Sequence, residues 1–204
     1  IAAIVMAYLL LLAVPSMGLS PASYNQFAGR YLILQGFFMF LPLKFIHYIW
    51  DVAAGRSRVY SLADFALWMF FFPSFRNAPF ERIQSVVEQK ASLPESLTGQ
   101  DVMYGLKRIV IGAFKGALGY LIFKYLSPVE VFASPESFAT VRLWVAAYSY
   151  SIALFLDFSG FADAMIGSSR LLGYRLSENF DRPYLQTDTR GFWRGWNVTT
   201  SFWL

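Results

Sequence analysis

The sequence predicts an all-α, polytopic membrane protein, and three observations support this fold class. Hydrophobic residues make up 56% of the 204 residues and aromatic residues 19%, which lies outside the range of soluble domains. Long apolar stretches alternate with short polar loops. Basic residues are concentrated in some of these loops and missing from others. We expect a single membrane domain over residues 1–204, with about four transmembrane helices plus re-entrant and interfacial helices.

Two transmembrane helices are expected near the start of the chain. Residues 1–19 are nearly uncharged and long enough to cross the hydrocarbon layer, and Pro15 should kink or end this helix. After a polar loop, residues 31–50 form the second expected helix. The chain starts at Ile1 rather than methionine, so we interpret the first helix as incomplete.

Three ionisable residues lie toward the end of the second expected helix. Lys44, His47 and Asp51 fall on one helical face. We expect Lys44 to extend its ammonium group toward the interface and Asp51 to lie beyond the apolar layer. His47 is the only histidine of the chain, and we favour a structural hydrogen bond or solvent contact for it over a role as catalytic base.

The next apolar stretch, residues 62–72, ends at Pro73 and is too short for a layer that needs about 20 residues. We therefore expect a re-entrant or interfacial helix, with Arg56 and Arg76 on the same side of the membrane. The amphipathic residues 80–90 should lie on the membrane surface or pack under neighbouring loops.

The following transmembrane helix is expected over residues 101–125, with Asp101 near its N-terminus. Gly112, Gly116 and Gly119 recur along it at helical spacing. Small residues in such a row let membrane helices approach closely, so we interpret the row as a packing surface.

The last clear transmembrane stretch, residues 141–158, runs into Ser159 and Gly160. Glycine lowers helix propensity, so we expect a bend or break here before a second helical piece over residues 161–172. Such a break should line a cavity, with Ser159 and Asp163 on one face.

A final helix is expected over residues 190–204, capped by Asp188 or Thr189. Its tryptophans suit the membrane interface. Polar residues recur along it at helical spacing and should form one stripe: Arg190, Arg194, Asn197 and Ser201.

Charge and composition restrict the function. Residues 76–108 and 175–194 are rich in lysine and arginine, whereas residues 127–140 hold acidic but no basic residues, so the positive-inside rule places the basic segments in the cytoplasm. The net charge of +4 is spread between apolar stretches, which argues against nucleic acid as a partner. The chain has no cysteine, which excludes a thiol nucleophile, and no metal site is expected.

Several linked motifs follow one another between Asp157 and the end of the chain. They are Asp157-Phe-Ser-Gly-Phe-Ala-Asp163, Ile166-Gly, Arg170-Leu-Leu-Gly-Tyr, Glu178-Asn-Phe-Asp-Arg-Pro-Tyr184 and Phe192-Trp-Arg-Gly-Trp-Asn197. Charges at membrane depth cost about 2.5–3.5 kcal/mol each on insertion scales, which makes this the functional stretch by default. In their order and spacing these motifs resemble the membrane-bound O-acyltransferase (MBOAT) family, and most closely its bacterial branch that modifies alginate and teichoic acid.

The resemblance implies transfer of an acyl group, acetyl or similar, from a cytoplasmic thioester to a hydroxyl acceptor such as a cell-envelope polysaccharide. The donor would be acyl-CoA or acyl carrier protein, and no covalently bound cofactor is expected. The chain would be the N-terminal part of a larger protein of the bacterial cytoplasmic (inner) membrane. Its expected partners are membrane lipid and the donor carrier, and the resemblance leaves open an extracytoplasmic acyltransferase or acceptor partner.

Acyl transfer needs a base for the hydroxyl proton and a hydrogen-bond donor for the developing oxyanion. The resemblance places the base, a histidine, beyond Leu204. Asn197 is the catalytic candidate in this chain, because its amide could orient the acceptor or stabilise the oxyanion. Bacterial relatives usually carry histidine at the matching position and several eukaryotic branches asparagine, which leaves the substrate open. The substrate-channel candidates are Asp157, Ser159, Asp163, Arg190, Arg194, Trp196 and Ser201.

Two other functions stay open at this point. Asp157 and Asp163 could form the proton relay of a transporter or channel, although we favour structural pairing of these carboxylates with Arg170 or other basic residues. The chain could also be a catalytically silent relative that serves as a membrane partner. For Asn197, the alternative is a solvated side chain on an interfacial helix.

Overall fold

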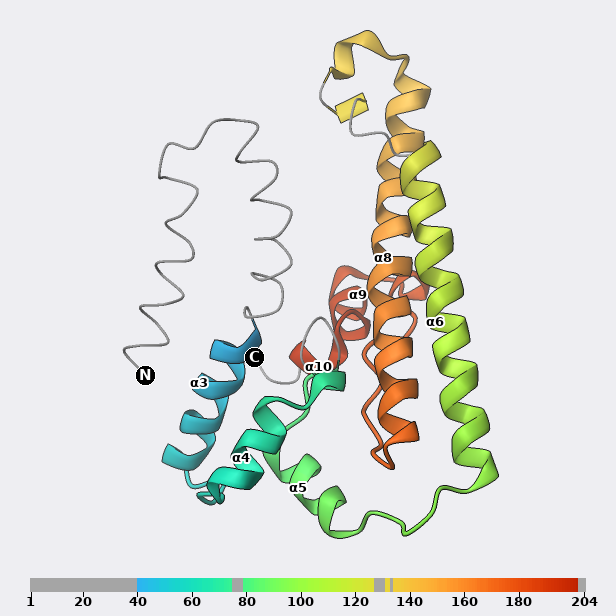
Figure 1. Cartoon of the computed structure of the whole chain (residues 1–204). Helices are drawn as coiled ribbons and strands as arrows, with labels where there is room; N and C mark the ends of the chain where they lie inside the picture. Colours follow the sequence, from blue (N-terminus) through green and yellow to red (C-terminus); the bar gives the residue numbers. More distant parts are fainter. Residues whose placement is uncertain (1–39, 75–78, 127–130, 133, 202–204) are drawn as a thin grey trace, which may run out of the picture. The chain divides into compact units, whose positions relative to one another are not determined.

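The structure, a computed structural model, describes residues 40–74, 79–126, 131–132 and 134–201 (Figure 1). The expected helix over residues 1–19 and the start of the next one lie outside the described residues. Regular structure in the described part is helical, with no strand and one isolated bridge between Phe180 and Trp196. The all-α fold class is confirmed. The chain divides into two compact units, residues 1–76 with 82–87 and residues 77–81 with 88–204, which are described separately.

The described residues of the first unit form α3 (Phe40–Ala53), α4 (Leu62–Met69) and the first part of α5 (Ile83–Ala91), which extends into the second unit. The N-terminus of α4 is capped by Ser61, whose Oγ accepts a hydrogen bond from the Asp64 N–H at 3.2 Å. An eight-residue helix rises only about 12 Å, so α4 is too short to cross a bilayer, in line with the sequence. We expected Arg56 and Arg76 on the same side of the membrane, but Arg76 lies outside the described residues.

Lys44 is completely buried in the first unit, with an exposed fraction of 0%. Its Nζ donates hydrogen bonds to Ser74 Oγ at 2.7 Å and to the Trp68 carbonyl oxygen at 3.2 Å, and it lies 5.3 Å from the centroid of the Trp68 ring. The expectation that Lys44 extends toward the interface is therefore wrong. Two acceptors and an aromatic face compensate its charge inside the unit.

Asp51 is also buried and accepts contacts from several basic groups. One carboxylate oxygen lies 3.1 Å from His47 Nε2 and 3.7 Å from Arg82, and the other lies 3.5 Å from Arg56 Nε. The Asp51 carbonyl accepts the N–H groups of Arg56 and Ser57, which closes the end of α3. His47 makes a structural contact, as expected.

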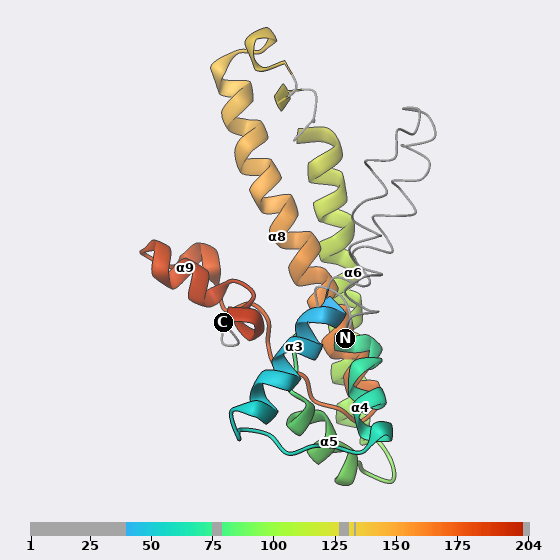
Figure 2. The same cartoon turned by 90° about the vertical axis from the view of Figure 1, so that its left-hand side faces the viewer.

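In the second unit two long helices, α6 (Gly99–Leu126) and α8 (Thr140–Leu171), lie side by side in both views (Figures 1 and 2). Both are long and apolar enough to cross a membrane by length and composition. Gly105 of α6 packs near Gly167 of α8, and Gly119 packs near Ala153, so the helices are antiparallel.

Glycine at the crossing point brings the two backbones into contact. A Cβ atom on Gly160 would lie 2.7 Å from the Gly112 carbonyl oxygen, and one on Gly112 would lie 2.8 Å from the Ala164 nitrogen. The expected packing row is confirmed for Gly112 and Gly119, whereas a Cβ on Gly116 would meet no atom within 4 Å.

A break at Ser159 and Gly160, one form of the predicted bend or break, is excluded because α8 runs without interruption from Thr140 to Leu171. Glycine costs a helix about 1 kcal/mol relative to alanine, and here its missing side chain allows the close approach to Gly112. The helix ends at Leu171, and Gly173 follows with a φ of +86°. Together with the hydrogen bond from the Tyr174 N–H to the Ser169 carbonyl, it forms a glycine C-cap.

The segment after α8 contains the 3₁₀ turn η4 (Pro183–Leu185) and the short helices α9 (Thr189–Gly195) and α10 (Val198–Ser201). Asp188 caps α9, since its Oδ1 accepts the Gly191 N–H at 2.7 Å, as predicted. The predicted continuous helix and its single polar stripe are wrong. Trp196 is extended and pairs with Phe180, which ends α9 before Asn197.

Candidate functional site

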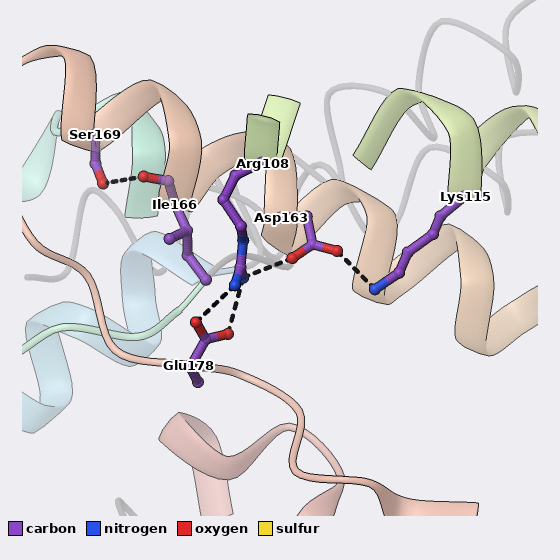
Figure 3. A network of polar contacts seen from close by, with 6 residues as sticks. All are labelled: Arg108, Lys115, Asp163, Ile166, Ser169 and Glu178. Carbon is purple, nitrogen blue, oxygen red and sulfur yellow. Dashed lines mark hydrogen bonds and ion pairs between the residues drawn. The ribbon is translucent and has the colours of Figure 1, made fainter. Parts of the chain in front are cut away.

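A network of four charged side chains joins α6, α8 and the segment that follows α8 (Figure 3). Asp163 of α8 is 6% exposed, and its two oxygens bind two different cations of α6. Arg108 lies 2.5 Å from Oδ1, and Lys115 Nζ donates to Oδ2 at 2.6 Å. Arg108 also donates to both oxygens of Glu178, at 2.7 and 2.8 Å.

This network confirms the expectation that Asp163 pairs with basic residues, but the partners come from α6. Arg108 and Lys115 are seven residues apart, or about two helical turns, so both face Asp163. Arg170 instead forms an ion pair with Asp101 at 2.8 Å. Both oxygens of this carboxylate are occupied by cations, which suits a structural tie better than a proton relay.

Asp157 lies away from this network. Asp157 and Asp163 are six positions apart on the helix, which turns their side chains about 120° apart around the helix axis. Asp157 is exposed and lines a groove of about 280 Å³ along α6 and α8. The described residues thus contain no Asp157–Asp163 carboxylate pair.

Asn197 occupies the turn between α9 and α10 with a φ of +48°. This left-handed region is unfavourable for most residues but is accessible to asparagine, aspartate and histidine. Its Oδ1 accepts a hydrogen bond from Thr200 Oγ1 at 3.1 Å, and its carbonyl accepts the N–H groups of Thr200 and Ser201, both at 3.0 Å. The side-chain amide Nδ2 of this half-buried residue donates no hydrogen bond within the described part of the chain.

Buried Asn179 fixes the two residues after Asn197. Its carbonyl accepts the Val198 N–H at 2.9 Å, and its Oδ1 accepts from Thr199 Oγ1 at 2.7 Å. The same Thr199 oxygen accepts the Phe80 N–H at 2.8 Å. With an exposed fraction of 2%, Asn179 holds the turn from inside the unit.

An aromatic cluster fixes the residue before Asn197. Trp196 stacks on Phe192 at a centroid distance of 5.6 Å and meets Phe180 edge to face at 5.3 Å. Phe155 of α8 contacts Trp196 at 6.0 Å, so the cluster joins the turn to the long helix. The Tyr184 hydroxyl donates to the Ser151 carbonyl of α8 at 3.0 Å, and burial raises the pKa of this tyrosine.

The comparisons with known proteins agree with these motifs. The family model of MBOAT, the membrane-bound O-acyltransferase family, matches residues 18–204. The chain belongs to this family. The resemblance predicted from the sequence motifs is thereby confirmed.

Three relatives illustrate the range of this MBOAT chain. It is 30% identical to the probable alginate O-acetylase AlgI of Azotobacter vinelandii, over 94% of the chain and 37% of the relative. It is 31% identical to the teichoic acid D-alanyltransferase of Bacillus subtilis, over 67% of the chain and 34% of the relative. It is 28% identical to the peptidoglycan O-acetyltransferase of Helicobacter pylori, over 69% of the chain and 27% of the relative. The chain thus spans well under half the length of these relatives.

The other substrate-channel candidates of this MBOAT chain fall into different environments. Ser159 is buried, and its Oγ has no hydrogen-bond partner among the described residues. Ser201 donates to the carbonyl oxygens of Trp193 and Trp196, both at 3.2 Å, and so closes the turn around Asn197. Arg190 and Arg194 are exposed on α9. Trp196 belongs to the packed aromatic cluster.

Sequence reasoning missed Arg108, Lys115, Glu178 and Asn179 as site residues. One signal could have found the first pair: two cations two turns apart on an apolar helix need an anion at the same depth, and Asp163 is buried on the neighbouring helix. The contributions of Glu178 and Asn179 depend on how the segment after α8 returns to the helix pair.

Proposed function

We propose that the full-length protein is an O-acyltransferase. It would move an acyl group, acetyl or similar, from a cytoplasmic thioester, either acyl-CoA or acyl carrier protein, to a hydroxyl of a cell-envelope polysaccharide. The family supports the reaction class, and the names of the three relatives each join an acetyl or alanyl transfer to an envelope polymer. This function requires residence in the bacterial cytoplasmic (inner) membrane.

The observation that carries the proposal is the unused amide of Asn197. It stands at the end of the family motifs, in a turn that Asn179, Thr199 and Trp196 fix from both sides. A preorganised amide donor stabilises an oxyanion without reorganisation cost during the reaction. The left-handed backbone also explains why asparagine fits where bacterial relatives usually carry histidine, since both residues tolerate this conformation.

In the proposed reaction the acceptor oxygen bonds to the thioester carbonyl carbon, and the carbon–sulfur bond then breaks. The acceptor proton passes to a base, which we expect in the protein beyond Leu204, and from there to the leaving thiolate. The chain has no cysteine, so its residues offer no thiol for an acyl-cysteine intermediate. In this proposal the acyl group passes directly from donor to acceptor.

The charge distribution supports donor entry from the cytoplasm. The N-terminal end of α6 and the C-terminal end of α8 meet at one end of the antiparallel pair, beside the basic residues Lys90, Arg170 and Arg175. Glu136, in the described part of the connection between the two helices, lies at the other end. Positive loops face the cytoplasm, where the carrier would dock, and the acceptor or an extracytoplasmic acyltransferase would receive the group on the far side.

Reconstitution of the full-length protein in liposomes tests this function. Acetyl-labelled CoA or acetyl-labelled acyl carrier protein is placed on the side of the liposome membrane that the basic loops face, here the lumen. A hydroxyl-bearing envelope polysaccharide is supplied outside. We expect ester-linked label on the polysaccharide, and no label when the donor is supplied only to the opposite side. If neither donor gives transfer to alginate, teichoic acid or peptidoglycan, the proposal is refuted.

A further inference from the structure

Asp157 is an exposed carboxylate near the middle of α8. At a rise of about 1.5 Å per residue, it lies about 25 Å from the start of the helix and about 21 Å from its end. The hydrocarbon layer is about 30 Å thick, so a helix of this length that crosses it places this carboxylate within the layer. Membrane proteins keep such groups where a cavity or a partner receives them.

The described residues supply no hydrogen bond or ion pair to the Asp157 carboxylate, whereas Asp163 binds two cations. The side chain instead opens into the groove of about 280 Å³. The other residues that line this groove are Gly119, Tyr120, Phe123, Tyr150, Ala153 and Leu154.

The groove has the chemistry of a helix-docking site with one charge. Its lining includes Gly119 and Ala153, small buried residues at which α6 and α8 pack against each other. Tyr120, Phe123 and Tyr150 present rings that suit both apolar packing and the stem and charge of a basic side chain. Asp157 adds a carboxylate, and a purely apolar neighbouring helix would leave this carboxylate without a partner.

We infer that this groove receives a lysine or arginine from a membrane helix of the full-length protein outside residues 1–204. Charge complementarity selects a cation. The relatives are more than twice as long as the part matched here, so the family has further chain to supply it. Within residues 1–39 the sequence has one lysine or arginine, Arg30, and it follows a polar stretch rather than standing inside an apolar one. The inference does not depend on the proposed acyl transfer.

Photo-crosslinking in native membranes tests the occupant. A benzophenone amino acid replaces Tyr120, which is 62% exposed at the groove, in the full-length protein. We expect an intramolecular crosslink to an apolar peptide that contains lysine or arginine and lies outside residues 1–204. The matched control replaces Phe114, which is 66% exposed on the same helix outside the groove, and should not capture that peptide. Capture at Tyr120 of lipid alone, of a peptide within residues 1–39 or of a separate protein would overturn the inference.

A charge exchange tests the chemistry independently of activity. Asp157→Lys should lower the melting temperature and yield of the full-length protein, and replacing the crosslinked basic residue by aspartate in the same protein should restore both. Asp157→Asn should lower the melting temperature less than Asp157→Lys. Unchanged melting with Asp157→Lys, or no rescue by the exchange, would show that no basic side chain occupies the groove.

Discussion

Arg108 of α6 donates two hydrogen bonds, of 2.7 and 2.8 Å, to the two carboxylate oxygens of Glu178, which lies beyond the end of α8. The same guanidinium lies 2.5 Å from Asp163, so one side chain ties the segment that carries Asn197 to both long helices. These side-chain contacts of Arg108 connect the segment with the proposed catalytic turn to α6 and α8.

Glu178→Gln should weaken this tie only modestly. The Glu178 side chain is 57% exposed, and an exposed pair of this kind contributes about 0.2–1 kcal/mol. We expect a loss of that size in the free energy of unfolding of the full-length protein, measured by denaturant titration in detergent. Glu136→Gln, on the exposed 3₁₀ turn η3 (Pro135–Ser137), serves as control and should change nothing. A loss equal to that of a buried charge would contradict the exposure argument.

Asp163→Asn should be far more damaging. The substitution leaves Lys115 and Arg108 facing a neutral amide inside the unit, and loss of one partner of a buried pair costs about 3–5 kcal/mol. The added change Lys115→Met should recover part of the stability, because it removes one unpaired charge. Thermal unfolding of the single and double variants measures this coupling, and strictly additive effects would show that the two side chains do not interact.

Gly112→Ala and Gly116→Ala form a matched pair on α6. A methyl group at Gly112 would collide with the backbone of α8, whereas one at Gly116 meets nothing within 4 Å. We expect Gly112→Ala to destabilise the protein by about 1–3 kcal/mol, as overpacking does. Gly116→Ala should be neutral or stabilising by up to about 1 kcal/mol through helix propensity. Equal effects at both positions would be incompatible with the observed packing.

Ser92 and Ser134 should lie on opposite sides of the membrane. Ser92 precedes α6 and Ser134 follows it, with a helix of 28 residues between them. Residues 1–204 contain no cysteine, so single substitutions Ser92→Cys and Ser134→Cys add the only thiol in this part of the protein. An impermeant maleimide applied to intact cells should label Ser134→Cys, and Ser92→Cys only after permeabilisation. Labelling of both from one side would refute the topology.

The long helices were predictable because their pattern is local. Residues 101–125 and 141–158 were predicted as apolar spans, with a further helical piece over 161–172, and α6 and α8 cover nearly the same residues. The function of Gly160 was not predictable in this way. A glycine can bend a helix or allow another helix to pack closely against it. The residue that packs against Gly160 is Gly112, which lies on another helix and is not marked by the local sequence.

The same limit explains the errors at Lys44 and at the end of the chain. The burial of Lys44 depends on acceptors at Trp68 and Ser74, which one helical face cannot reveal. Residues 190–204 have a helical pattern, but pairing between Trp196 and Phe180 overrides it and turns the chain at Asn197. Of the site itself, the motif residues were found, while their ties to α6 were not.

The turnover of Asn197 variants in the full-length protein tests the central claim most directly. Asn197→Ala removes the amide but also strains a backbone with a φ of +48°, whereas Asn197→Gly removes the amide and accepts that backbone. If the amide stabilises the oxyanion, both variants should lose about a hundredfold in kcat with unchanged expression, and Asn197→His should retain more activity than either. An Asn197→Gly enzyme with full turnover would mean that the residue only shapes the turn, and would contradict the account.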